Sequence, residues 1–224
     1  MEAVKKMNDD AIKQYLEDLL PVRNKFFQGL EQFAKEHRVP IMEPTGIAAM
    51  LQMMKIQKPK QILEIGTAIG YSALRMADAL PDTKVVTLEM DDIRVEQALS
   101  NIQLLGVERQ IKVIKGNALN LYDEVAAHGM YDAIFIDAAK GQYIKFFEMY
   151  RELLTENGCI YTDNVLFKGL VAQTDTPNKR LASLVGKINA YNRWLMDNKR
   201  FDTVILPVGD GLAVSRKRTG VGNE

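Results

Sequence analysis

The sequence has very little cysteine and histidine, with one Cys and two His in 224 residues. A single cysteine excludes an internal disulfide bond. Because Cys159 sits in an apolar run, we expect it to be buried and chemically inert. The chain has no Cys/His cluster, which argues against a zinc site.

The sequence also lacks net charge and long apolar runs. Its 29 Lys and Arg balance its 29 Asp and Glu, which argues against a strongly basic nucleic-acid binder but permits a local basic face. No stretch approaches the roughly 18 apolar residues of a membrane span, and the polar start is unlike a signal peptide. We therefore expect a cytoplasmic protein without membrane association, long enough for one domain with a full core.

The most informative stretch runs from residue 61 to residue 73. An apolar run from Ile62 to Ile65 stops at Gly66, and helical spacing begins after Gly70. This pattern predicts a strand, a tight glycine turn and a helix. Such a turn lets a ligand approach the backbone and the N–H groups of the helix start. The glycine spacing differs from the dinucleotide fingerprint, and an ordinary strand-to-helix turn is the alternative.

A second β-rich run, residues 84–88, ends in an acid, Glu89. An acid at the end of the next strand is well placed to accept hydrogen bonds from a ribose. It could instead cap the following helix. With the glycine turn it favours a nucleoside cofactor, and the missing second phosphate-binding glycine disfavours NAD.

Strand-like and helix-like segments alternate through the rest of the chain. The alternation predicts an α/β fold with a mostly parallel sheet, and Gly209-Asp210-Gly211 is typical of a β-hairpin turn. Helices before the first strand must pack on an outer face or on another subunit. We expect strands at 61–65, 84–88, 111–115, 131–136, 158–162, 201–207 and 212–217, helices at 9–20, 22–37, from 44, 71–80, 92–105, 119–127, 141–154 and 178–198, and a long loop at 166–177.

Polar side chains follow two of the predicted strands. Asp137 follows the strand 131–136, and Asp163 with Asn164 follows the strand 158–162. Ligands of parallel sheets bind at these strand ends, and hard oxygen donors suit Mg²⁺, Mn²⁺ or Ca²⁺. Each acid alone could be a helix cap. Two acids and an amide converging beside a cofactor crevice favour a metal site.

Together these motifs resemble the cation-dependent O-methyltransferases. The resemblance rests on the stretch from Glu64 to Ser72 (EIGTAIGYS), on Leu88-Glu89-Met90, on Asp137 and on Asp163-Asn164, and it covers residues 39–217. The family includes catechol and caffeoyl-CoA O-methyltransferases and a bacterial branch that methylates 5-hydroxyuridine in tRNA. It implies a Rossmann-like seven-stranded sheet with one antiparallel strand, S-adenosylmethionine (SAM), Mg²⁺ or another divalent cation, and a homodimer.

The resemblance also implies roles for individual residues. It makes residues 1–224 one methyltransferase domain, with 1–56 as an N-terminal helical cap. From the sequence itself we expect the tail at 219–224 to be disordered. It makes Lys140 the general base beside Asp137, although the sequence leaves open whether the lysine or the metal mainly activates the hydroxyl. The implied metal ligands are Asp137, Asp163 and Asn164, and the implied cofactor-binding residues are Met42, Glu64, Gly66, Gly70, Ser72, Glu89, Met90, Gly116, Asn117, Ala118 and Asp137.

The acceptor of the methyl group stays open between two classes. The segments Asp137 to Lys140 (DAAK) and Asp163 to Gly169 (DNVLFKG) are most similar to the tRNA branch, which implies methylation of 5-hydroxyuridine at wobble position 34 to 5-methoxyuridine. The alternative is a small catechol-like or caffeoyl-type phenol, and a non-enzymatic nucleoside-binding module is a third interpretation. The basic residues that could meet tRNA phosphates are Lys55, Lys58, Lys60, Lys168, Lys179, Arg180, Arg216, Lys217 and Arg218.

Overall fold

The computed structural model describes residues 9–173 and 178–218. The tail predicted from residue 219 lies outside the described residues. None of the helices within the described ranges is long and apolar enough to span a membrane.

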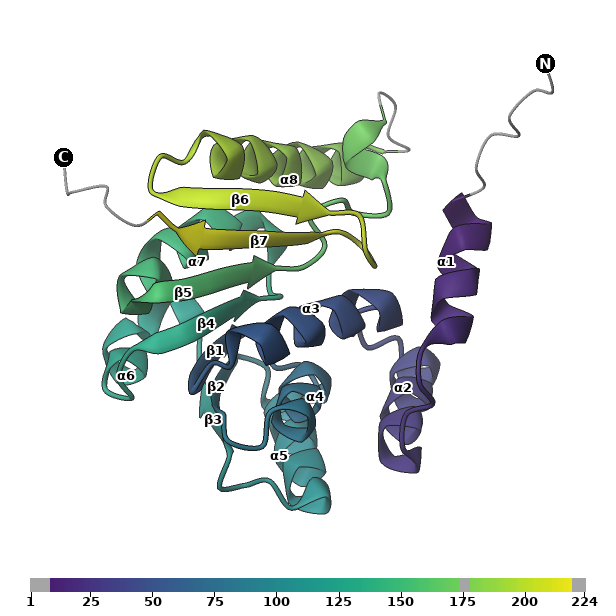
Figure 1. Ribbon diagram of the computed structural model, residues 1–224, viewed down its shortest axis with the longest axis vertical. Helices are drawn as coiled ribbons and strands as arrows, with labels where there is room; N and C mark the ends of the chain where they lie inside the picture. Colours follow the sequence, from purple (N-terminus) through teal and green to yellow (C-terminus); the bar gives the residue numbers. More distant parts are fainter. Residues whose placement is uncertain (1–8, 174–177, 219–224) are drawn as a thin grey trace.

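Seven strands form one sheet, in the order β3-β2-β1-β4-β5-β7-β6 (Figure 1). All neighbouring pairs from β3 to β5 are parallel, and β7 is antiparallel to both β5 and β6. The predicted mostly parallel sheet with one reversed strand from the C-terminal hairpin is therefore confirmed. The strands are β1 Gln61–Ile65, β2 Lys84–Glu89, β3 Ile111–Lys115, β4 Tyr131–Ile136, β5 Leu154–Thr162, β6 Phe201–Leu206 and β7 Leu212–Lys217.

Eight α-helices and four short 3-10 helices are found within the described ranges. The α-helices are α1 Asp9–Leu19, α2 Lys25–His37, α3 Pro44–Gln57, α4 Tyr71–Ala79, α5 Asp92–Leu105, α6 Tyr122–Ala126, α7 Tyr143–Tyr150 and α8 Lys179–Asp197. The 3-10 helices are η1 Ala118–Asn120, η2 Lys140–Gln142, η3 Arg151–Leu153 and η4 Leu170–Ala172.

Several predicted boundaries were wrong by a few residues. Helix α2 begins at Lys25 instead of residue 22, because the side chain of Asn24 caps it by accepting a bond from Phe27 N at 3.0 Å. The helices expected at 119–127 and 141–154 each contain 3-10 turns. Strand β5 begins at Leu154 instead of residue 158, and a register shift beside Tyr131 accommodates the extra residues.

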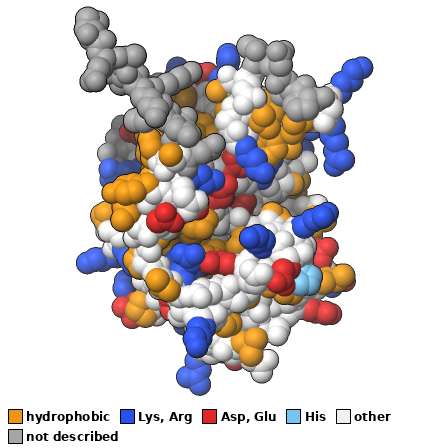
Figure 2. Space-filling model, turned by 90° about the vertical axis from the view of Figure 1, so that its right-hand side faces the viewer, with side chains coloured by type: hydrophobic (Ala, Val, Ile, Leu, Met, Phe, Trp, Pro, Cys, Tyr) orange, Lys and Arg blue, Asp and Glu red, His pale blue; other side chains and the backbone are white. Residues whose placement is uncertain are grey.

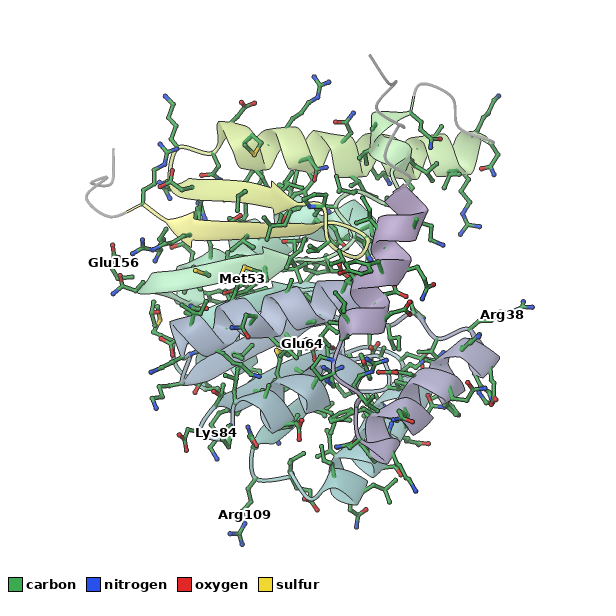
Figure 3. All side chains as sticks on the ribbon, turned by 45° about the vertical axis from the view of Figure 1, so that its right-hand side comes forward. Arg38, Met53, Glu64, Lys84, Arg109 and Glu156 are labelled. Atoms are coloured by element: carbon green, nitrogen blue, oxygen red, sulfur yellow. The ribbon has the colours of Figure 1, made fainter. Side chains whose placement is uncertain are left out.

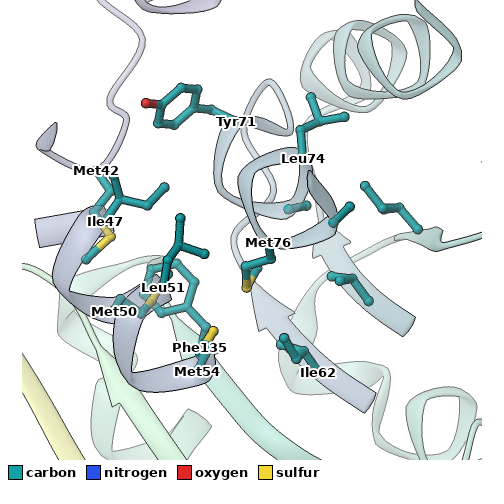
Figure 4. Close-up of a cluster of buried hydrophobic side chains, with 14 of the residues drawn as sticks. Met42, Ile47, Met50, Leu51, Met54, Ile62, Tyr71, Leu74, Met76 and Phe135 are labelled. Atoms are coloured by element: carbon teal, nitrogen blue, oxygen red, sulfur yellow. The ribbon is translucent and has the colours of Figure 1, made fainter. Parts of the chain in front are cut away.

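The sheet lies between two helical layers, each with its own buried cluster. Side chains alternate along each strand, so Ile62 and Phe135 face the first cluster while Leu63 and Ile134 face the second. Helices α2, α3, α4 and α5 cover the first face, and α6, α7 and α8 cover the other. Figure 4 shows side chains of α3 and α4 packing toward Ile62 and Phe135 in the first cluster. The core is therefore built on both sides of one sheet whose strand ends stay open.

The N-terminal helices pack on one outer face of the sheet, as expected, and form part of the first helical layer. Met50 and Met54 of α3 are fully buried against the sheet, and Phe27 of α2 joins the same cluster. Helix α1 is tied to the start of α3 by an ion pair between Lys13 and Glu43 at 2.7 Å. Cys159 is only partly buried, so the expectation of full burial was wrong, although burial still raises the pKa of its thiol.

Candidate active site

A cleft of about 330 Å³ opens at the C-terminal ends of β1, β2 and β4. Figure 2 looks onto this face of the molecule, where acidic and basic side chains border a hollow. Of the residues named from the sequence, the cleft lining includes Met42, Gly66, Ser72, Glu89, Met90, Gly116, Asn117, Ala118, Asp137, Lys140 and Asn164.

The turn between β1 and α4 forms the floor of the cleft. Gly66 has φ +105°, and a Cβ there would lie 2.1 Å from the carbonyl oxygen of Asp137. The glycine is therefore required by the close approach of β1 and β4, before any ligand is considered. Gly70 (φ +84°) sits at the start of α4 and does not line the cleft.

Glu89 fixes the edge of the cleft through backbone donors. Its Oε2 accepts a bond from Ala68 N at 2.9 Å, and its Oε1 accepts bonds from Met90 N and Asp91 N at 2.8 and 3.0 Å. Three N–H groups thus hold one carboxylate in a single orientation. A carboxylate has about four lone-pair sites, so acceptor capacity remains for a ligand hydroxyl.

Glu64 lies beneath the turn and does not reach the cleft. Glu64, labelled in Figure 3, is fully buried in the interior of the molecule. Its carboxyl group accepts bonds from the hydroxyls of Ser72 and Thr87. Thr67 extends the chain by a 2.6 Å contact with Thr87. Burial raises the pKa of Glu64 to about 8, although the two hydroxyl donors oppose that shift. The arrangement ties α4 to β2 behind the floor of the cleft.

The remaining walls of the cleft come from three loops. The segment from Gly116 to Ala118 follows β3, and the Asn117 side chain caps η1 by accepting a bond from Leu119 N at 3.0 Å. Met42 is 3% exposed and belongs to the core, whereas Met90 is 67% exposed. Tyr71 and Arg94 also line the cleft. Sequence reasoning missed both, because their positions look like ordinary helix residues.

Asp137, Asp163 and Asn164 meet beside the cleft at the ends of β4 and β5. Asn164 Nδ2 donates to Asp163 Oδ2 at 3.1 Å, while the buried Asp163 Oδ1 has no hydrogen-bond partner within residues 9–173 and 178–218. Burial raises the pKa of both carboxyls, and the charge of Asp137 raises that of Asp163 further. No three His, Cys, Asp or Glu side chains within 9–173 and 178–218 are arranged to hold a metal. A metal site here therefore depends on the Asn164 amide as its third donor.

Lys140 begins η2 and reaches into the same cluster. Its Nζ donates to Asn164 Oδ1 and lies 6.0 Å from the centroid of the Phe167 ring. Its charge also opposes the rise in the pKa of Asp137. The structure thus brings together all four residues singled out from the sequence on this side of the cleft.

Asp210 is a further polar residue of this cluster that the sequence indicated only as part of a hairpin turn. It is 9% exposed, and its Oδ2 accepts a bond from Asn164 Nδ2 at 3.3 Å. Burial raises its pKa. A buried acid in a turn of the Gly-Asp-Gly type has no sequence signal that separates it from an exposed one.

The nine basic residues considered for tRNA divide between the two ends of the strands. Lys168, Lys179 and Arg180 lie near the cleft, beside η4 and at the start of α8. Lys55 lies in the last turn of α3, and Lys58 and Lys60 lie between α3 and β1. Arg216 and Lys217 are at the C-terminal end of β7, where Arg216 pairs with Cys159 of β5, and Arg218 follows them. Six of the nine therefore lie at the end of the sheet opposite the cleft.

Comparisons with known proteins agree with this architecture. The family model described as O-methyltransferase matches residues 22–218. Caffeoyl-CoA O-methyltransferase of Stellaria longipes is 31% identical over 222 residues, covering 94% of this chain and 92% of that protein. A putative caffeoyl-CoA O-methyltransferase from Staphylococcus aureus has a solved structure that is 38% identical with a TM-score of 0.88, covering 93% of this chain and 100% of that one.

A further solved structure concerns the cofactor. The O-methyltransferase from Bacillus cereus in complex with SAH is 26% identical with a TM-score of 0.79, covering 93% of this chain and 97% of that one. The match with the family model spans the sheet and nearly all of the helices described above. The chain therefore belongs to the O-methyltransferase family and is a SAM-dependent O-methyltransferase.

Proposed function

We propose that this enzyme methylates one oxygen of a neighbouring oxygen pair on a planar ring, with a divalent cation bound beside the cofactor. The observation that carries the proposal is the meeting of Asp137, Asp163, Asn164 and Lys140 at one end of the cleft. Two acids, an amide and a lysine at a strand-end crevice fit an acceptor that must be oriented and deprotonated.

The cofactor end of the cleft suits the parts of SAM in order. We assign the ribose hydroxyls to Glu89, because that carboxylate is already oriented by three N–H groups. The adenine fits the wall formed by Met90 and by Gly116 to Ala118, and the amino-acid end fits Ser72 and Met42. Glu64 and Gly70 contribute by shaping the turn, since neither lines the cleft.

The residues present also fit a divalent cation. Asp163 Oδ1 is a buried oxygen without a hydrogen-bond partner among the described residues. Burial raises the pKa of both carboxyls and the charge of Asp137 raises that of Asp163 further, although Lys140 opposes both shifts. Asp137, Asp163 and Asn164 would hold Mg²⁺, Mn²⁺ or Ca²⁺. When bound, the cation would neutralise charge on the acceptor oxygens and lower the pKa of an acceptor hydroxyl.

Lys140 is our proposed general base. Its Nζ lies within the cluster, held by Asn164 and beside the Phe167 ring. A neutral Nζ would take the proton of the acceptor hydroxyl, whose oxygen then forms a bond to the methyl carbon as the carbon–sulfur bond breaks. The walls of the cleft hold the two reactants in line, which is the main source of rate for reactants that are already activated.

A small phenol of the caffeoyl or catechol type is the acceptor class that the comparisons support best. The relative from Stellaria longipes is named for caffeoyl-CoA, and so is the similar Staphylococcus aureus structure. The 5-hydroxyl and 4-carbonyl of 5-hydroxyuridine in tRNA form a comparable oxygen pair. Lys168, Lys179 and Arg180 near the cleft favour this second candidate, whereas six basic residues at the far end of the sheet do not.

We also propose that residues 1–224 form one methyltransferase domain, with 1–56 as its helical cap, and that the protein is a homodimer. The exposed apolar side chains of Tyr15, Leu19 and Val22 on and after α1 support a subunit contact. Sedimentation at several concentrations tests the dimer. A concentration-independent monomer would contradict it.

One experiment tests the activity and separates the acceptors. The purified protein is incubated with labelled SAM and Mg²⁺, with tRNA carrying 5-hydroxyuridine in one tube and a panel of catechols and caffeoyl esters in the other. We expect EDTA-sensitive label on the phenols, and 5-methoxyuridine in the first tube would instead establish the tRNA acceptor. The Asp137→Ala variant should be inactive in both tubes, and full activity in EDTA would refute the metal.

A further inference from the structure

The turn between β6 and β7 packs against the segment that follows β5. Asp210 lies at its centre and is nearly fully buried. Its backbone oxygen accepts bonds from Leu166 N at 3.0 Å and from Phe167 N at 3.3 Å, and its Oδ1 accepts a bond from Lys168 N. One residue of the hairpin therefore receives three consecutive N–H groups of the loop beside the candidate active site.

That loop is strained, which makes its anchorage informative. Asn164, Phe167 and Lys168 have φ values of +58°, +45° and +54°, in the left-handed region that residues other than glycine rarely adopt. Such conformations persist where the surroundings hold them in place. The bonds to Asp210 supply that constraint at the Phe167 and Lys168 backbone, and they place the Phe167 ring beside Lys140.

The second carboxylate oxygen of Asp210 acts on Asn164 directly. Asn164 Nδ2 donates to Asp210 Oδ2 at 3.3 Å and to Asp163 Oδ2 at 3.1 Å. Carboxylate oxygens only accept, so they select the NH₂ side of the amide. Asn164 Oδ1 must then point the other way, toward Lys140, where it accepts a bond from Nζ.

Close packing around the two glycines of the turn holds this contact in place. Gly211 has φ +89°, and a Cβ there would lie 2.4 Å from Leu166 Cγ. A Cβ on Gly209 would lie 3.0 Å from the Cα of Gly46 in α3. The hairpin is thus wedged between α3 and the loop that carries Asn164, with no space for a side chain on either glycine.

We propose that Asp210 is a positioning residue, which fixes the Asn164 amide with its oxygen available to a divalent cation and holds the loop 164–168 in its strained shape. Asp210 is not itself proposed as a ligand, because its Oδ2 is turned to Asn164 Nδ2 and its Oδ1 to Lys168 N. The inference rests on the proposed metal function. Partners of this kind typically change metal affinity about 10- to 100-fold.

The test is direct Mn²⁺ binding to the full chain, measured by calorimetry, with SAM binding and the melting temperature measured beside it. Asp210→Asn keeps the shape but presents an NH₂ group to the NH₂ group of Asn164, which favours rotation of that amide. We expect Mn²⁺ binding at least about 10-fold weaker, SAM binding within twofold, and a melting temperature within a few degrees of the wild type. Asp202→Asn, an exposed aspartate of β6 that pairs with Arg218 at 2.7 Å, is the matched control and should leave all three unchanged.

Two further variants keep the outcome interpretable. In an Asn164→Ala background, Asp210→Asn should weaken Mn²⁺ binding by less than twofold more, because no amide remains to be oriented. If Asp210→Asn does not fold, Asp210→Ser keeps an oxygen acceptor on a shorter side chain that does not reach Asn164, and it should show the same loss of Mn²⁺ affinity.

Three results would overturn the inference. Mn²⁺ binding within twofold of the wild type in a folded Asp210 variant would show that the contact between Asp210 and Asn164 does not orient the Asn164 amide for the cation. Parallel losses of Mn²⁺ binding, SAM binding and melting temperature would show general loosening instead of positioning. Failure of the wild type itself to bind Mn²⁺ would refute the proposed metal function, and this inference with it.

Discussion

The C-terminal ends of the strands form two neighbouring regions, which surround their acidic side chains in opposite ways. In the cofactor half, at the ends of β1 and β2, Glu89 accepts three backbone N–H bonds and Glu64 accepts two hydroxyl bonds. In the half of the proposed metal site (the metal half), at the ends of β4 and β5, Asp163 has a buried oxygen without a partner in the described part of the chain, and Asp137 lies close enough to raise its pKa.

The difference indicates which half is complete without its ligand. The Glu89 carboxylate receives three N–H donors and needs no further charge. Burial raises the pKa of Glu64 to about 8, so this carboxyl is largely neutral below that pH. Two buried carboxylates beside each other are stabilised only by protons or by a cation, and Lys140 supplies one positive charge against two. The cofactor half is therefore preorganised for a polar ligand, whereas the metal half carries excess negative charge of the kind that our proposed divalent cation would neutralise.

The largest expected effect comes from removing an acid of the metal half. Asp163→Asn keeps the size of a fully packed side chain but removes one charge, and we expect turnover to fall by more than about 100-fold, beyond the range typical of outer partners of a metal. SAM binding should stay within threefold, because Asp163 does not line the cofactor cleft. Initial rates with and without EDTA, and calorimetry with SAM, measure the two halves separately. Equal losses of turnover and of SAM affinity would contradict the division of the site into two halves.

The next effect comes from the cofactor half. Glu89→Ala removes the carboxylate that we assign to the ribose hydroxyls, and a hydrogen bond to a charged group contributes about 1.5–3 kcal/mol. We therefore expect SAM binding to weaken roughly 10- to 100-fold while Mn²⁺ binding is unchanged. Calorimetry with each ligand measures both quantities. A variant with normal SAM affinity would contradict the assignment of Glu89 to the ribose.

The pH dependence of the two ligands should also differ. Metal ligands must be deprotonated, and the pKa of Asp137 and of Asp163 is raised above the usual range of an aspartate. Apparent Mn²⁺ affinity should therefore rise with pH through these raised values, by up to about 10-fold per pH unit for each displaced proton. SAM affinity should change far less over the same range. Titrations from pH 5 to pH 8 measure both, and parallel profiles would contradict the comparison.

Sequence patterns predicted the order of the elements because each strand end is marked chemically. Gly66, Glu89, Asp137 and Asp163 each stand one residue after an apolar run or at its end. Parallel strands that end at one edge bring such residues together. The mostly parallel sheet was therefore predictable from these patterns, while the seven strands with one reversed strand were implied by the family resemblance and the hairpin signal at Gly209-Asp210-Gly211.

What the sequence could not show depends on contacts between distant segments. Asp210 reaches Asn164 only because β7 pairs with β5, which places the hairpin turn beside the metal half. Glu64 belongs to the cofactor motif, yet the structure shows it buried beneath the turn. Local spacing carries no information on either point, because burial and cross-strand contact are set by tertiary packing.

The smallest functional effect should come from replacing Glu64. This acid belongs to the cofactor half but does not line the cleft. Glu64→Gln replaces the carboxyl with an amide that can accept one hydroxyl bond and donate to the other, so SAM binding should stay within about threefold. Glu124→Gln, on the exposed surface of α6, is the matched control.

The effect of Glu64 should instead be found in the pH dependence of stability. Its pKa is about 8 in the folded protein against 4.5 for an ordinary, solvated glutamate, so between these values the folded chain holds a proton that the unfolded chain releases. The free energy of unfolding of the wild type must then fall as pH rises through this window, by at most about 1.4 kcal/mol per pH unit from this group. Glu64→Gln does not titrate and should lose that part of the slope, which urea unfolding at pH 5.5, 6.5 and 7.5 measures. Identical slopes in the variant and the wild type would mean that Glu64 is charged under the turn, and the cofactor half would then share the uncompensated charge of the metal half.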